Sequence, residues 1–447
     1  MAPDLIARYG MRQVPRYTSY PASPHFMGDV DAQTYGAWLE AMPQGATGSL
    51  YLHVPFCRQM CRYCGCHTFI TRRDEPIAEM AALLRREMAM AADRLPHRLQ
   101  VSSIHFGGGT PSLLPPAEFA LLMAQMAERF DIDADAEIAI EIDPRTLTRE
   151  MARTLGEGGV NRVSLGVQTL ASHVQAAIDR VQPFGMIARA VEWLEGAGIG
   201  AINFDIMYGL PHQTEADCID TVRQVLALSP SRLAVFGYAH VPFFKRHQGY
   251  IDASALPGVM ERHAQAERIE EELTGAGYVS IGLDHFARAD DAMAIAHRDG
   301  TLRRNFQGYT TYRADVLLAF GASAIGKLPQ GFIQNAVPLS DYGRAIGEGR
   351  FATQRGRALT HEDRLRARII ERLMCDRRID LDGFAGKGEA LALADRDALR
   401  ELADDGLIAW QGSVIELKDR ARPFLRNVAC AFDAYLSASA GRHARAI

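Results

Sequence analysis

Six short apolar runs, each separated from the next by a longer segment, constrain the fold of this chain more than any other feature of its sequence. They read SLYLHVPF (49–56), VSSIHFGGG (101–109), AEIAIEID (136–143), RVSLGVQT (162–169), AINFDIMYG (201–209) and RLAVFGYAHV (232–241). Segments between them, such as residues 76–95 and 215–229, repeat apolar side chains at helical spacing. Alternating strands and helices predict an α/β fold with a parallel sheet and right-handed crossovers.

Six strand and helix units are two short of a complete eightfold barrel. The pattern is typical of an incomplete barrel and equally of an open, doubly wound sheet. In both arrangements, ligands bind at the carboxyl ends of the strands. We therefore expect the functional residues in the loops that follow the six runs.

The sequence pattern changes after about residue 355. Two helical segments (360–375 and 389–406), a short hairpin with the sequence LIAWQGSVIEL and a closing helical segment with the sequence RPFLRNVACAFDAYL follow in that order. We predict four parts of the chain: an N-terminal arm at 1–48, a partial barrel with its extension at 49–355, a linker within that extension at 329–349, and a mainly helical, winged-helix-like C-terminal domain at 356–447.

Composition and charge exclude several classes of protein. The net charge of -5 and the even mixture of acidic and basic residues in the C-terminal part give no basic face for nucleic acid. No run of about 18 apolar residues predicts a membrane span, and the first residues lack the apolar core of a signal peptide. We expect a cytoplasmic protein with no nucleic-acid partner and no membrane span.

The loop after the first apolar run is rich in sulfur. Four of the seven cysteines, Cys57, Cys61, Cys64 and Cys66, fall within ten residues there. A chain of 447 residues, 48% of them hydrophobic, buries a large core without disulfides, and an odd, clustered set of cysteines is not typical of secreted proteins. The other three, Cys218, Cys375 and Cys430, lie in helical patterns and are expected in the core.

The first three of the clustered cysteines have the spacing C-x3-C-x2-C. Soft thiolate ligands select iron-sulfur clusters, zinc or copper(I). A structural zinc site needs a second ligand pair, and a redox C-x-x-C motif leaves Cys57 and Cys66 unexplained. We favour a 4Fe-4S cluster held by Cys57, Cys61 and Cys64, in which one of the four irons stays open to another ligand.

At this loop the chain resembles the radical S-adenosylmethionine (SAM) superfamily, in which such a cluster binds SAM at its open iron. Tyr63, directly before the third cysteine, matches the aromatic residue usual at that position. The resemblance implies an incomplete parallel (β/α)6 barrel with the cluster loop after its first strand. It also implies a 4Fe-4S cluster and SAM as cofactors.

Two further motifs gain meaning from the resemblance. FGGGTP ends the second run, and the resemblance implies that Gly108, Gly109 and Thr110 contact SAM, although a tight turn alone explains a glycine run. EIDP places Glu141 near the end of an apolar strand, where an acid needs a partner. A ribose diol and an arginine ion pair are the two alternatives for that partner.

A closer resemblance, over nearly the whole chain, is to the family of oxygen-independent coproporphyrinogen III oxidases, also called coproporphyrinogen dehydrogenases. The matching segments include PRYTSYP, YLHVPFC with CGC, GGGTP, EIDPR, SLGVQ, DIMYGLP, YAH, DHFARADD and NFQGYTT. Haem-chaperone relatives of that family usually lack PRYTSYP, the fourth cysteine and NFQGYTT. The aromatic residues Phe106 and Tyr63 are small departures from the pattern.

The family resemblance implies a radical decarboxylation in haem biosynthesis. Two propionates of coproporphyrinogen III become vinyl groups, which gives protoporphyrinogen IX. The reaction uses a 5'-deoxyadenosyl radical, which forms from SAM when the cluster supplies an electron. A monomer, an electron donor and an electron acceptor are implied as well. Two alternatives remain: a haem-binding or haem-delivery relative without decarboxylase activity, and a radical SAM methyltransferase acting on tetrapyrroles.

The family resemblance also implies the roles of particular residues. Tyr51 and Cys66 are implied as catalytic, although Cys66 also fits a spare small apolar residue. Tyr51, Tyr63, Ala239 and Ile325 are implied cofactor contacts, and Gln168, Arg180 and Asp205 are implied to hold a second SAM. A structural salt bridge between Arg180 and Asp205 is the alternative. Candidates for binding the substrate carboxylates are Arg16, Lys245, Arg246, Arg303 and Arg304.

Overall fold

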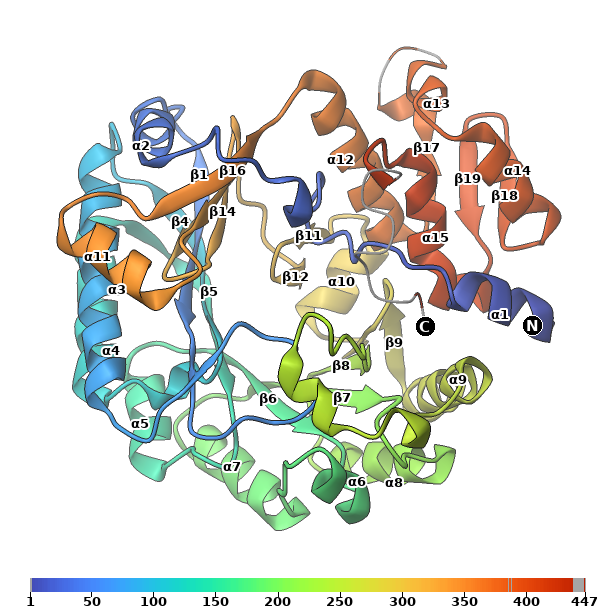
Figure 1. Cartoon of the computed structure of the whole chain (residues 1–447), viewed down its shortest axis with the longest axis horizontal. Helices are drawn as coiled ribbons and strands as arrows, with labels where there is room; N and C mark the ends of the chain where they lie inside the picture. The colour runs from blue at the N-terminus through green and yellow to red at the C-terminus, as the bar shows by residue number, and fades with distance from the viewer. Residues whose placement is uncertain (1, 385, 387, 437–445, 447) are drawn as a thin grey trace.

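The computed structural model describes residues 2–384, 386, 388–436 and 446 (Figure 1). Its main feature is a curved sheet of twelve strands in the order β16-β15-β14-β13-β1-β4-β5-β6-β7-β8-β10-β9. The six predicted runs form six neighbouring parallel strands, which confirms the parallel α/β arrangement: β1 (Thr47–Val54), β4 (Gln100–Gly108), β5 (Asp131–Ile142), β6 (Arg162–Gln168), β7 (Ala201–Tyr208) and β8 (Arg232–Gly237).

Helices follow these strands and cover the outer, convex face of the sheet (Figure 1). They are α3 (Glu75–Arg94), α4 (Pro116–Arg129), α5 (Arg149–Glu157), α6 (Ser172–Ala177), α7 (Phe184–Gly196), α8 (Glu215–Leu226) and α9 (Val259–Gly275). The main hydrophobic core lies between the two layers and includes Leu50 and Leu52 of β1 and Leu84 and Met88 of α3. Because side chains alternate along a strand, the residues between the core residues face the concave interior.

The sheet continues past both ends of the parallel set. β13 (Val316–Phe320) pairs parallel with β1, and the antiparallel strands β14 (Ile325–Leu328), β15 (Gly331–Asn335) and β16 (Thr353–Ala358) follow. At the other end, β10 (His285–Arg288) pairs antiparallel with β8 and with β9 (Tyr278–Ile281). The short elements α10 (Ala292–Arg298), β11 (Arg303–Asn305) and β12 (Gly308–Thr310) connect the two ends.

The prediction of a linker at 329–349 is wrong. β15 and α11 (Leu339–Gly347) occupy most of that segment, and every residue of β15 is buried. Glu87 of α3 holds the region in place, because its carboxylate accepts hydrogen bonds from Gly321 N, Asn335 Nδ2 and Tyr342 Oη at 2.8, 2.6 and 2.8 Å. Burial raises the pKa of Glu87 to about 7.

A second hydrophobic core gathers the C-terminal helices and strands. These are α12 (His361–Asp376), β17 (Arg378–Asp380), α13 (Glu389–Ala392), α14 (Arg396–Asp404), β18 (Ile408–Gln411), β19 (Val414–Leu417) and α15 (Leu425–Ala429). The predicted helix at 389–406 is two helices, α13 and α14, with Asp395 capping the second one. The predicted closing helix is only α15 with a 3-10 turn on each side, and Pro423 lies in the turn before it.

The N-terminal segment spans both cores. Ile6 and Tyr9 of α1 (Pro3–Gly10), together with Tyr17 and Tyr20, belong to the second core. α2 (Ala32–Glu40) packs in the main core. Of the described helices, none is both long and apolar enough to cross a membrane.

Candidate active site

The concave side of the sheet is polar near the carboxyl end of β1. Tyr51 and His53 face that side, because the residues between and beside them, Leu50, Leu52 and Val54, are buried in the main core. The Tyr51 ring stacks on His105 of β4, with 5.9 Å between ring centroids and an interplanar angle of 18°. The strand order therefore brings aromatic and titratable groups together at the carboxyl ends of the parallel strands, on the concave side. We call this region the mouth of the barrel.

His53 links Tyr51 to the loop that carries the cysteines. Its Nδ1 is 2.9 Å from Tyr51 Oη, and its Nε2 is 3.3 Å from the carbonyl oxygen of His67. A carbonyl only accepts, so Nε2 carries the proton and Nδ1 accepts from the tyrosine hydroxyl. Burial lowers the pKa of His53 to about 4, which keeps the ring neutral near pH 7.

The glycines at the end of β4 allow the cysteine loop to approach closely. A β-carbon at Gly109 would lie 2.6 to 2.9 Å from backbone atoms of Phe56, and Gly108 has a φ of +122° with His53 and the Val54 carbonyl oxygen beside it. Thr110 is buried, and its Oγ1 lies 3.4 Å from Cys57 Sγ. Close packing within the protein alone therefore requires glycine at these positions.

Glu141 of β5 points into the mouth with 41% of its side chain exposed. Its Oε2 accepts from Gly108 N at 3.0 Å, and its Oε1 is 3.4 Å from His105 Nε2. The arginine ion pair expected as the alternative partner is not formed among the described residues. Glu141 thus keeps acceptor capacity toward the open side of the barrel.

The four clustered thiols lie near one another in a loop bounded by the short paired strands β2 (Phe56–Cys57) and β3 (Phe69–Ile70). The Cys66 thiol hydrogen-bonds to the Cys64 sulfur, and this lowers the pKa of Cys64 while the pKa of Cys66 is raised. Burial raises the pKa of Cys57 to about 11. Among the described residues, no three His, Cys, Asp or Glu side chains are already arranged around a metal position.

Arg180 contacts the cysteine loop and an acid other than the one expected. Its Nη1 lies 3.3 Å from Asp143 Oδ2 and 3.5 Å from Cys61 Sγ, and its Nη2 donates to the Gly166 carbonyl at 2.7 Å. The alternative of a salt bridge between Arg180 and Asp205 is wrong, because Asp143 is the carboxylate that Arg180 contacts. A β-carbon at Gly166 would lie 2.9 Å from Arg180 Nη2 and 3.0 Å from Gln168 Nε2.

Asp205 of β7 is held by its neighbours on the concave side. Ser164 Oγ donates to it at 2.9 Å and Asn203 Nδ2 at 2.8 Å. Burial raises the pKa of Asp205 to about 6, although these two donors oppose the shift, and the charge of Glu141 raises it further. Gln168 lies beside Arg180 at the end of β6, where its φ is +64°. Sequence reasoning missed Ser164 and Asn203.

Three side chains after β8 bind backbone carbonyls of the cysteine loop. Gln248 Nε2 donates to the Tyr63 carbonyl at 2.9 Å, His247 Nε2 lies 2.7 Å from the Cys64 carbonyl, and Lys245 Nζ donates to the Cys66 carbonyl at 2.9 Å. We call residues 245–248 the loop clamp. Sequence reasoning expected Lys245 at the substrate and missed His247 and Gln248; the only signal was a run of polar residues after YAHVPFF.

The remaining sequence-predicted residues contact other parts of the protein or solvent. Arg304 donates to the carbonyls of Tyr17 and Arg16 at 3.3 and 3.2 Å, and Arg303 is 3.8 Å from Glu371. Arg16 and Arg246 are exposed. Ala239 follows β8 and is partly buried, and Ile325 packs with Phe26 and Phe332. Cys218 and Cys375 are buried as expected, whereas Cys430 is half-buried and accepts a hydrogen bond from Tyr17 Oη.

The mouth suits a zwitterionic cofactor beside a thiolate-bound cluster. Three thiols supply soft ligands, a guanidinium at Arg180 suits a carboxylate, and the acids Glu141 and Asp205 suit a sulfonium or ammonium group. Within the described residues, Arg180 Nε and Asn203 Oδ1 are buried without a hydrogen-bond partner. Buried polar atoms normally have partners, so these two atoms fit polar groups of a ligand.

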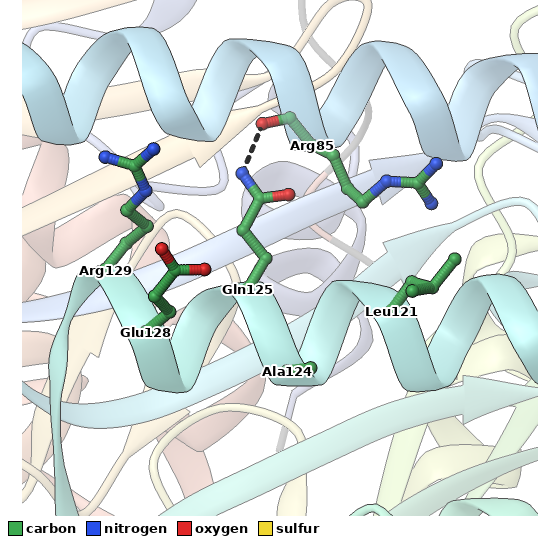
Figure 2. Close-up of a pocket in the computed structure, with 6 residues that line it drawn as sticks. All are labelled: Arg85, Leu121, Ala124, Gln125, Glu128 and Arg129. Atoms are coloured by element: carbon green, nitrogen blue, oxygen red, sulfur yellow. Dashed lines mark hydrogen bonds between the residues drawn. The ribbon is translucent and has the colours of Figure 1, made fainter.

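A surface hollow of about 320 Å³ lies elsewhere, between α3 and α4 (Figure 2). Its lining residues are Arg85, Leu121, Ala124, Gln125, Glu128 and Arg129. Both helices belong to the outer layer, on the far side of the sheet from Tyr51 and Glu141. The hollow is therefore separate from the candidate active site.

Comparisons with known proteins give matches over nearly the whole chain. Residues 51–225 match the Radical SAM superfamily, and residues 359–424 match the HemN C-terminal domain. The chain is 52% identical to the oxygen-independent coproporphyrinogen III oxidase of Bradyrhizobium diazoefficiens over the whole of both chains. It is 43% identical to that of Cereibacter sphaeroides over 96% of each. A solved structure of the Escherichia coli coproporphyrinogen III oxidase HemN matches with a TM-score of 0.89 and 35% identity, covering 95% of this chain and 100% of that one.

The loop clamp predicts a specific change in loop dynamics. Gln248→Ala removes the donor to the Tyr63 carbonyl, a loss of about 1 kcal/mol, so we expect residues 61–66 to exchange backbone hydrogens roughly fivefold faster. Hydrogen-deuterium exchange on the apoprotein measures this. Tyr250→Ala, two residues further along at an exposed position, is the matched control. Equal exchange in both variants would show that the clamp does not hold the loop.

Proposed function

The chain belongs to the family of oxygen-independent coproporphyrinogen III oxidases, and from that membership we propose how its residues carry out the reaction. The family reaction converts two propionates of coproporphyrinogen III to vinyl groups without oxygen, in haem biosynthesis. The incomplete parallel barrel is confirmed as the radical SAM fold. Full-length identity of 52% with an oxidase disfavours the haem-delivery and methyltransferase alternatives.

The cofactors of the family are a 4Fe-4S cluster and two SAM molecules. When bound, they supply a 5'-deoxyadenosyl radical that removes a hydrogen atom from a substrate propionate. The observation that carries the proposal is the convergence of three free thiols, Arg180 and Glu141 at the carboxyl ends of neighbouring parallel strands. The protein contributes position, charge and exclusion of water around that chemistry.

Cys57, Cys61 and Cys64 are the proposed ligands of the cluster. Their neighbours support this role, because each sulfur contacts a different polar group: Thr110, the two guanidinium groups of Arg145 and Arg180, and Cys66, respectively. The loop clamp would hold the backbone from Tyr63 to Cys66 in place beneath a bound cluster. Cys66 itself is exposed at the mouth and is proposed to act on the substrate side.

The first SAM would lie against β4 and β5. Gly108, Gly109 and Thr110 line that position, and Glu141 offers a carboxylate oxygen to a ribose hydroxyl. Tyr51 and Tyr63 flank it. The Tyr51 hydroxyl is oriented by His53, which fixes the ring above the mouth.

The second SAM would lie farther along the sheet, at β6 and β7. Gln168 ends β6 there, Asp205 lies within the neighbouring β7 opposite Gly166, and Arg180 offers its guanidinium to the carboxylate of this second molecule. Ala239, just after β8, is proposed to border the same space, and Ile325 of β14 remains a proposed cofactor contact. Arg180 sits between the two positions, because it contacts both Cys61 and the strand at Gly166. The buried Asn203 Oδ1, which has no hydrogen-bond partner in the described part of the chain, supports a ligand at Asp205.

The substrate and electron partners complete the proposal. Coproporphyrinogen III carries four carboxylates, and exposed Arg16 and Arg246 are the candidates that the protein leaves for them. Lys245, Arg303 and Arg304 already contact protein groups, which weakens their case. A separate electron donor and acceptor are required. Seven free thiols support a reducing, cytoplasmic setting.

The cysteine roles predict two classes of variant. Cys57→Ser, Cys61→Ser and Cys64→Ser should each lose stable cluster binding, because a hydroxyl replaces a soft ligand poorly. Cys66→Ser should keep the cluster and lose conversion of coproporphyrinogen III. Iron and acid-labile sulfide, measured on anaerobically purified protein, decide between them. A full cluster in any of the first three variants, or iron loss in Cys66→Ser, would contradict the assignment.

Asp205 predicts the number of bound SAM molecules. Asp205→Asn removes a charge-assisted contact of about 1.5 to 3 kcal/mol, so the second SAM should bind roughly 10- to 150-fold more weakly while the cluster stays intact. Anaerobic equilibrium dialysis counts bound SAM per cluster. Asp220→Asn, at an exposed position on α8, is the matched control. Two molecules bound with unchanged affinity in Asp205→Asn would make this acid structural.

A further inference from the structure

A second arginine contacts the sulfur of Cys61. Arg145 Nη2 lies 3.2 Å from Cys61 Sγ, closer than Arg180 Nη1 at 3.5 Å. A neutral thiol is a weak acceptor, whereas a thiolate accepts charge-assisted hydrogen bonds. Both guanidinium groups are positive at any accessible pH. Two such donors at one sulfur therefore indicate a site built to hold negative charge.

The other two proposed ligands have neutral hydrogen-bond partners at their sulfur atoms. Cys57 Sγ lies beside the hydroxyl of Thr110, and Cys64 is hydrogen-bonded by the Cys66 thiol. Lys245 and His247 approach this loop through backbone carbonyls rather than through a sulfur. Direct contact with guanidinium groups is thus specific to Cys61 among the three sulfurs, and the nearer of the two groups, Arg145, comes from the loop that follows β5.

Asp143 fixes the guanidinium of Arg145 in place. Arg145 Nε lies 3.0 and 3.1 Å from the two Asp143 carboxylate oxygens, and its Nη2 lies 2.6 Å from Oδ2. The backbone N of Arg145 also donates to Asp143 Oδ1 at 3.0 Å. Both side chains are largely buried, at 14% and 9% exposure. A group held this tightly cannot follow a substrate in and out of the mouth.

Arg145 and Arg180 differ in which guanidinium nitrogens remain available to a ligand. Arg145 commits Nε and Nη2 to Asp143 and Cys61, whereas Arg180 has longer contacts to Asp143 and a buried Nε without a partner among the described residues. This division gives Arg180 to a bound carboxylate and Arg145 to the sulfur. Hydrogen bonds and positive charge at a cluster thiolate favour the reduced, more negative cluster and so raise its reduction potential.

We propose that Arg145, oriented by Asp143, is a positioning residue that donates an N-H···S hydrogen bond to the Cys61 thiolate and raises the reduction potential of the cluster. The inference rests on the proposed function, because it takes Cys61 as a cluster ligand. One electron enters the cluster from an external one-electron donor, and no proton moves, since Cys61 is a thiolate in both oxidation states. The competing explanation is that Arg145 only braces the turn after β5.

The test is a reduction potential, which bracing alone would not change. Arg145→Met keeps the length of the side chain and removes its charge and donors. In a redox titration of the reconstituted cluster followed by electron paramagnetic resonance, without SAM or substrate, we expect the equilibrium constant for reduction to fall about tenfold, which is about 59 mV for one electron. Arg145→Lys, which keeps the charge, should recover at least part of that loss.

Arg149→Met is the matched control, because Arg149 is an exposed arginine four residues further along. It should leave the potential unchanged. A change of less than twofold in Arg145→Met with full iron content would overturn the inference while leaving the cysteine assignment standing. If Arg145→Met fails to retain iron, the same comparison is made with Arg145→Gln, which also removes the charge, and an unchanged potential in that variant would overturn the inference. A wild-type protein that binds no cluster would overturn both the inference and the proposed function.

Discussion

The contacts that fix the backbone of the cysteine loop are the constraint on which the rest of the site depends. The loop leaves β1, turns near β4, and is bound at three carbonyls by Lys245, His247 and Gln248 from beyond β8. Glycines at 108 and 109 let its start pack against the end of β4. The end of β4 and the segment after β8 thereby fix the backbone of the cysteine loop from two sides. Four thiols reach the mouth because its backbone is held on both sides.

Charge is distributed around that loop in a way that matches a zwitterion. Positive groups, Arg145 and Arg180, gather at Cys61. Negative groups, Glu141 and Asp205, lie on the neighbouring strands, where burial and mutual repulsion raise the pKa of Asp205 to about 6. Asp143 forms ion pairs with both arginines and so offsets the electrostatic repulsion between them. A cofactor with a carboxylate at one end and a cation at the other meets complementary charge at both.

Local patterns in the sequence predicted a large part of this arrangement. Alternating apolar runs gave the six parallel strands, and cysteine spacing together with the family resemblance located the mouth. Contacts between distant residues were not predictable. The sequence of residues 329–349 wrongly predicts a linker, because the buried strand in this segment depends on pairing with β14 and β16. The sequence suggests Asp205 as the salt-bridge partner of Arg180, since nothing local to Arg180 indicates that Asp143 is the carboxylate it contacts. Gln248 lies 185 residues from Tyr63, and no local signal connects them.

The central claim is that this mouth generates a radical for decarboxylation of coproporphyrinogen III. The most direct measurement is anaerobic turnover by the reconstituted protein with SAM, a one-electron reductant, an electron acceptor and coproporphyrinogen III, following 5'-deoxyadenosine and protoporphyrinogen IX together. The account predicts that both accumulate, with one 5'-deoxyadenosine formed for each propionate converted. A methylated tetrapyrrole, or binding of the tetrapyrrole with no 5'-deoxyadenosine formed, would contradict it.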